Sequence, residues 1–132
     1  MFEVEINALA PGPKRVQRTD LTEEGVAAAI REVTLARAAF ALVGKIDDRS
    51  IGDFMFWLVD DRARVRLDLH REWYATDPSV LHELPTAPVT FRDSDGSDYV
   101  EPYVNTVARA AALEAFWYWL RTGKMDPKLH WS

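Results

Sequence analysis

The chain has 132 residues, of which 48% are hydrophobic and 28% are charged, a composition that fits one globular domain over residues 1–132. It contains no Cys, which excludes disulfides, a thiolate nucleophile and a zinc site built on sulfur. The formal charge of −5 disfavours direct binding to nucleic acid and suits a basic protein partner, although the same charge also keeps a small domain in solution.

The N-terminal residues lack the basic region and apolar run of a secretory signal. No apolar stretch in the sequence reaches the roughly 18 residues that span a bilayer. Together with the missing Cys, these features lead us to expect a cytoplasmic protein that does not bind membranes.

The first third of the chain predicts a strand, a loop and a helix. Residues 2–7 alternate apolar and polar side chains, as in a strand with one buried and one wet face. Pro, Gly and polar residues over positions 10–18 predict a loop. Asp20 or Thr22 can cap a helix whose apolar residues over positions 26–33 form a buried stripe.

The middle of the chain predicts strands. Residues 39–43 are apolar on both faces and indicate a buried strand, or a continuation of the helix. Residues 54–59 are also apolar throughout and belong in the centre of a sheet. They are followed by a turn at Asp60-Asp61 and by alternation over residues 64–69, which together predict a hairpin with one wet face.

Residues 70–88 are irregular and rich in Pro, so we expect a long loop, or a loop with one short strand or turn, that carries Trp73 and Tyr74. A second hairpin is predicted next, because Asp95-Gly96 stands between two alternating runs.

A final helix is expected from Ala108 to Arg121, with Gly123 ready to end it in a left-handed conformation. Trp119 lies off the predicted apolar stripe, so it either packs on a second surface or is exposed. The stripe consists of Ala110, Leu113, Phe116, Trp117 and Leu120. The order of elements predicts an α+β fold, in which two helices pack on one face of an antiparallel or mixed sheet of five or six strands.

The sequence predicts neither a metal site nor a bound cofactor. His70, His82 and His130 do not have the spacing of metal ligands. Residues 93–104 begin like a calcium loop, but they place Asp98 where the loop requires Gly and Val104 where it requires Glu. Glycine-rich phosphate loops and nucleophile elbows are also missing, so no catalytic residue is predicted.

The best candidate for a binding surface combines the acidic second hairpin with aromatic side chains of the loop. Loop aromatics are common anchors of protein interfaces, although Trp73 and Tyr74 can equally fold back over the edge of the sheet. The partner-binding candidates are Trp73, Tyr74, Asp93, Asp95, Asp98, Tyr99 and Glu101.

The C-terminal segment resembles a family of bacterial immunity proteins, the first-numbered family of the polymorphic toxin systems. The resemblance lies in the helix that ends in Thr122-Gly123, in Pro127 after it, and in the terminal Leu129-His130-Trp131. An acidic-Gly turn, here Asp95-Gly96, precedes the helix. The match covers roughly the last 40 of the 132 residues. The rest of the chain agrees in the order of its elements.

This resemblance implies a cytoplasmic antidote that binds a cognate protein toxin, often a nucleic-acid deaminase or a nuclease, and catalyses no reaction. It supplies no contact residues, because Gly123 and Trp131 are expected to be structural. The chain is expected to act as a monomer or a homodimer. The alternative is a small ligand-binding or enzymatic domain whose pocket lies between sheet and helices.

Overall fold

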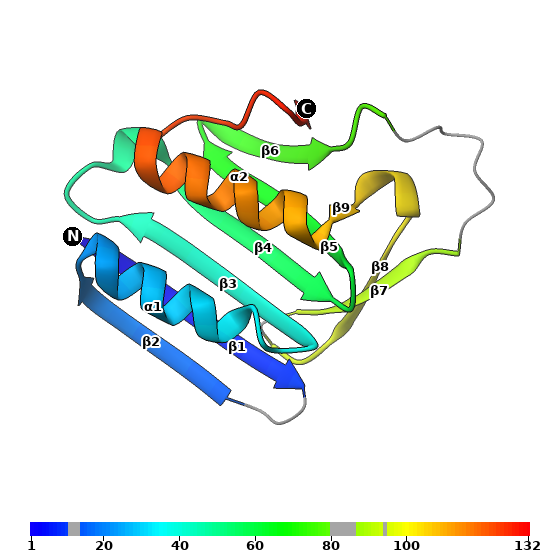
Figure 1. Ribbon diagram of the computed structural model, residues 1–132, viewed down its shortest axis with the longest axis horizontal. Coiled ribbons are helices and arrows are strands. Elements are labelled where there is room, and N and C mark those ends of the chain that lie inside the picture. The colour runs from blue at the N-terminus through cyan, green and yellow to red at the C-terminus, as the bar shows by residue number, and fades with distance from the viewer. Residues whose placement is uncertain (11–13, 80–86, 94) are drawn as a thin grey trace.

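The computed structural model describes residues 1–10, 14–79, 87–93 and 95–132. In this part of the chain, two helices lie side by side on one face of a large antiparallel sheet (Figure 1). In chain order the elements are β1 (Phe2–Ala10), β2 (Lys14–Leu21), α1 (Glu23–Val33), β3 (Ala38–Lys45), the 3₁₀ turn η1 (Arg49–Ile51), β4 (Asp53–Val59), β5 (Arg62–Leu69), β6 (Arg71–Thr76), β7 (Val89–Arg92), β8 (Asp98–Glu101), η2 (Tyr103–Asn105), β9 (Val107–Ala108), α2 (Arg109–Thr122) and β10 (His130–Trp131).

The α+β class and the antiparallel sheet are confirmed, but the sheet is larger than expected. Within the described residues it has eight strands, seven of them in the order β10-β6-β5-β4-β3-β1-β2, with β9 paired to β5. The predicted loop at residues 10–18 was wrong in part, because β2 begins at Lys14, whereas β6 is a short strand of the kind allowed within residues 70–88. Both strands lie near the sides of the sheet and carry many charged side chains, so they lack the hydrophobic signal of a central strand.

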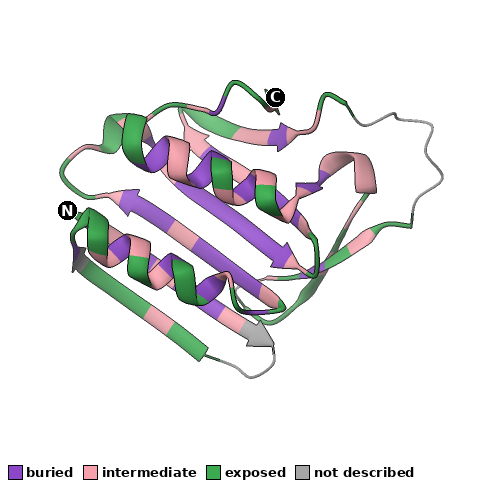
Figure 2. Cartoon of the chain, in the orientation of Figure 1, coloured by how far each residue is buried: buried purple, intermediate pink, exposed green. Residues whose placement is uncertain are grey.

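The main core lies between the sheet and the two helices. Phe54 and Phe56 of β4 meet Phe116 of α2, with ring centroids 5.5 and 5.6 Å apart. A smaller cluster lies on the opposite face of the sheet, where the separate β7–β8 hairpin packs Phe91 against Trp57 and its neighbours. The central strands β3 and β4 are therefore buried almost throughout, whereas β2 is largely exposed (Figure 2).

Helix α1 begins where its cap was expected. The Thr22 hydroxyl accepts a hydrogen bond of 3.2 Å from the Gly25 amide, which satisfies one of the free donors of the first turn. Val26, Ile30 and Val33 are fully buried and form the predicted stripe. Neither α1 nor α2, the helices of the described part of the chain, is long and apolar enough to cross a membrane.

Helix α2 has the predicted bounds but a different buried face. Trp119 is completely buried, and its indole nitrogen donates a hydrogen bond of 2.8 Å to the Ile51 carbonyl. In contrast, Ala110 is exposed and Trp117 is only half-buried. The predicted stripe was right at Phe116 and Leu120, which are buried, and wrong in its other members. Residues 110–120 are almost all apolar, so the sequence does not mark which side faces solvent. Gly123 ends the helix at φ 72°, as predicted.

Candidate functional site

The face of the sheet opposite the helices, here called the open face, carries a row of carboxylates. Strand register aligns Glu3 of β1 with Gly44 of β3, Gly44 with Asp53 of β4, Asp53 with Asp68 of β5, and Asp68 with Glu72 of β6. Directly paired residues of neighbouring strands point to the same side of a sheet. The four acidic side chains therefore form one line across the sheet, the acidic row.

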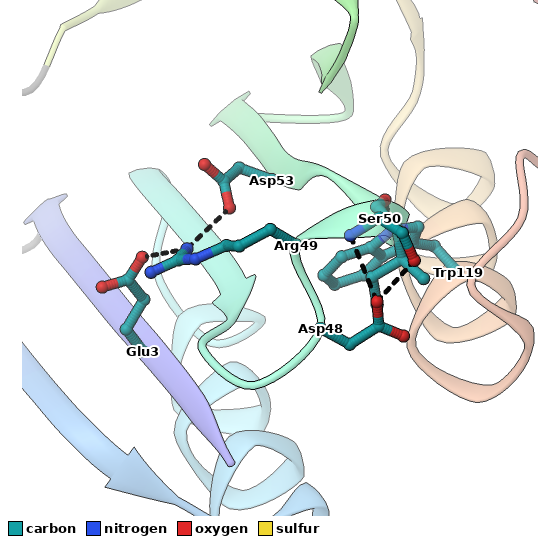
Figure 3. Close-up of polar contacts among 7 residues, drawn as sticks. Glu3, Asp48, Arg49, Ser50, Asp53 and Trp119 are labelled. Carbon is teal, nitrogen blue, oxygen red and sulfur yellow. Dashed lines mark hydrogen bonds and ion pairs between the residues drawn. The ribbon is translucent and has the colours of Figure 1, made fainter.

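One end of the acidic row is held by Arg49, which belongs to the turn η1. Its Nη1 atom lies 2.7 Å from Glu3 Oε1 and 3.4 Å from Asp53 Oδ1 (Figure 3). Gly44 makes room for this arrangement, because a Cβ atom there would overlap the Asp53 carboxylate and lie 3.1 Å from Arg49 Nη1. The missing side chain at position 44 of β3 therefore lets charged groups of two other strands and a turn approach one another.

Arg66 binds the other end of the row. Its guanidinium donates two hydrogen bonds, of 2.6 and 2.9 Å, to the Asp68 carboxylate, and its Nη2 atom lies 2.8 Å from Glu72 Oε1. Two guanidiniums are thus shared among the four carboxylates of the row. These six groups together carry a net negative charge.

The carboxyl of Asp53, within the acidic row, has a raised pKa. Partial burial raises the pKa of this carboxyl above its ordinary value, and repulsion from Glu3 and Asp68 raises it further. Arg49 acts in the opposite direction but does not compensate. A cation placed over the row would relieve this repulsion.

The predicted hairpin carboxylates lie on the open face or at its margin and have local partners. Asp93 accepts a hydrogen bond of 3.3 Å from the Trp57 indole. Asp95 is exposed and accepts hydrogen bonds from the Ser97 hydroxyl and amide, which lower its pKa. Asp98 is exposed and lies 3.4 Å from the Arg92 guanidinium. Asp95 and Asp98 are therefore the hairpin carboxylates best placed to meet a partner.

Tyr74, Tyr99 and Glu101, from two elements, meet around the buried guanidinium of Arg64. The guanidinium lies 4.0 Å above the Tyr74 ring and 3.8 Å from Glu101, and it donates a hydrogen bond of 2.5 Å to the Asn105 carbonyl. Burial raises the pKa of Tyr99 and of Tyr74. This cluster ties the hairpin and the segment after it to the main sheet.

Trp73 lies apart from the other predicted residues. It is adjacent to Tyr74 on β6 and points to the opposite face, where it packs half-buried against the main core. Its indole nitrogen donates a hydrogen bond of 3.1 Å to the Leu69 carbonyl. The two aromatic side chains therefore do not form one loop-borne anchor, because both belong to a strand.

Sequence reasoning missed the acidic row, although part of its signal was visible. The alternation of residues 2–7 and 64–69 showed that Glu3 and Asp68 lie on wet strand faces. Only the register of five strands shows that these faces coincide and that Asp53 lies between Glu3 and Asp68. For metals, the described residues contain no group of three His, Asp or Glu side chains that could hold an ion. His82 lies outside those residues.

A cavity of about 560 Å³ lies on the other side of the sheet, between α1 and the β1–β2 pair. Its lining is mainly aliphatic, with Lys14, Arg18 and Glu32 as its charged members. Comparison with known proteins does not assign a role to either feature, because no protein-family model and no curated protein matches this chain.

Proposed function

We propose that this chain is an immunity protein that binds and neutralises a cognate bacterial toxin in the cytoplasm, without catalysing a reaction. The proposal starts from the resemblance of the C-terminal segment to immunity proteins of polymorphic toxin systems. The structural observation that carries it is the acidic row, which lies on the same face of the sheet as the hairpin with Asp95 and Asp98.

A toxin that acts on nucleic acid presents a basic groove to its substrate. An acidic face that enters this groove would steer the encounter and exclude the nucleic acid. The repulsion of Asp53 by Glu3 and Asp68 supports this mode of binding, since a basic partner would relieve it. An antidote needs an affinity in the nanomolar range or tighter, about −12 kcal/mol at 25 °C.

The first test is to look for a toxin domain encoded next to this chain and to measure the protection of cells that express it. Asp68→Lys combined with Glu72→Lys is expected to abolish protection, because it replaces two carboxylates of the acidic row by cations. Glu114→Lys is the matched control, since Glu114 is exposed on α2, on the other side of the molecule. Growth after toxin induction measures the effect, and circular dichroism checks that each variant is folded.

If the control loses as much protection as the double variant, or if the double variant protects as well as the wild type, the acidic row is not the toxin-binding surface. The alternative function, a small ligand-binding or enzymatic domain, is favoured by the cavity between α1 and the sheet. In that case, cells with an intact chain would gain no protection, and the purified protein would bind or convert a small molecule.

A further inference from the structure

Strand β2 differs in charge from the molecule as a whole. Over residues 14–21 it reads Lys-Arg-Val-Gln-Arg-Thr-Asp-Leu, with three cations and one carboxylate, in a chain whose formal charge is −5. β2 stands at the end of the strand order, next to β1. Its outer backbone edge is therefore in a position to pair with an additional strand.

The aliphatic cavity lies directly beside this edge. Val16 of β2 and Ile6 of β1 contribute from the sheet, and Val33 contributes from α1. Leu35, which is 84% exposed, lies at the rim. A segment that pairs with β2 would place every second side chain over the cavity.

Two basic side chains of β2 flank the apolar side chain of Val16. Lys14, Val16 and Arg18 all line the cavity, as their alternation along the strand requires. Lys14 also forms an ion pair of 2.8 Å with Glu32 of α1. A strand paired with β2 therefore finds an apolar neighbour at Val16, with one basic neighbour on each side of it.

We propose that β2 is a docking edge for an extended acidic peptide, with the pattern acidic–x–apolar–x–acidic. The apolar side chain enters the cavity beside Val16, and the two carboxylates lie opposite Lys14 and Arg18. Cations on an edge strand also protect it from pairing with other sheets. Protection alone does not require an aliphatic cavity at the same position, whereas peptide docking uses both features. This site is independent of the acidic row.

The test uses the full ¹⁵N-labelled chain and the heptapeptide Thr-Glu-Thr-Leu-Thr-Glu-Thr, followed by NMR titration. We expect saturable shifts in β2 and in the facing residues of α1. The matched peptide with Lys in place of both Glu residues is expected to bind at least about tenfold more weakly, because the attraction across both cross-strand charge pairs becomes repulsion. The double variant Lys14→Glu/Arg18→Glu is expected to reverse this preference.

A second comparison leaves the protein unchanged and so does not depend on the folding of that variant. The peptide with Ser in place of Leu is expected to bind several-fold more weakly, since it leaves the cavity empty. Equal binding of the acidic and basic peptides, or shifts confined to the acidic row, would overturn the proposal. So would saturation of the cavity by decanoate with no response to any peptide, which would indicate a lipid site.

Discussion

At the scale of single residues, the folded structure shifts the pKa values of two carboxyls near η1 in opposite directions. Partial burial and two neighbouring carboxylates raise the pKa of Asp53, whereas hydrogen bonds from the Ser50 hydroxyl and amide lower the pKa of Asp48. The two side chains lie in adjoining segments (Figure 3). The two carboxyls therefore form a pair for testing whether the acidic row raises the pKa of Asp53.

Asp53→Asn is expected to gain stability relative to the wild type as the pH rises. Because the folded-state pKa of Asp53 is raised, its contribution to stability is fully present below the unfolded pKa of about 3.9 and is lost as the pH rises through the folded pKa. Asn does not titrate, so the variant does not share this loss. Urea unfolding at several pH values between about 3 and 7 measures the difference in the free energy of unfolding.

Asp48→Asn is the control with the opposite sign. The lowered folded-state pKa of Asp48 means that its contribution is present above the unfolded pKa and disappears as the pH falls through the folded one. The Asn variant should thus lose stability at neutral pH and approach the wild type in acid. The same pH trend in both variants would contradict the account of the acidic row.

At the scale of elements, Arg109 joins segments that are distant in the sequence. Its guanidinium donates hydrogen bonds to the Ala36 carbonyl at 2.5 Å, the Asp60 carbonyl at 2.9 Å and the Thr34 carbonyl at 3.2 Å. These acceptors belong to the end of α1 and to the turn between β4 and β5. The first residue of α2 therefore fixes the position of α1 relative to the sheet.

Arg109→Met is expected to lower the free energy of unfolding by about 2 kcal/mol or more, because it leaves several partly buried carbonyls without a donor. Arg109→Lys should recover only part of the loss, since an ammonium lacks the planar fork of the guanidinium. Arg121→Met on the exposed side of α2 is the control, with an expected change within about 0.5 kcal/mol. Equal effects at the two positions in urea unfolding would refute this role.

The elements also show why the sequence predicts some parts of the fold and not others. Both helices, the buried strands β3 and β4, and the Asp95-Gly96 hairpin carry strong local patterns, and the structure confirms them. The peripheral strands β2 and β6 have polar compositions that resemble loops. The buried face of α2 and the contacts of Arg109 depend on packing partners elsewhere in the chain, for which the local sequence carries no signal.

At the scale of the whole molecule, the two candidate binding surfaces lie on opposite faces of the sheet. The acidic row and the hairpin lie on the open face, whereas Lys14 and Arg18 of β2 flank the cavity on the helix side. The candidate residues of the hairpin were predictable from one turn motif. The acidic row was not, because it exists only after five strands have paired in register.

The central claim is that the open face binds a basic toxin directly. The measurement that tests it most directly is the affinity of the purified chain for any toxin domain found encoded by a neighbouring gene, by titration calorimetry at low and physiological salt. We predict a complex with a Kd of about 1 nM or tighter that weakens as salt rises and weakens strongly with Asp68→Lys/Glu72→Lys. A purified pair that forms no complex, or one whose affinity is unchanged by salt and by the double variant, would contradict the account.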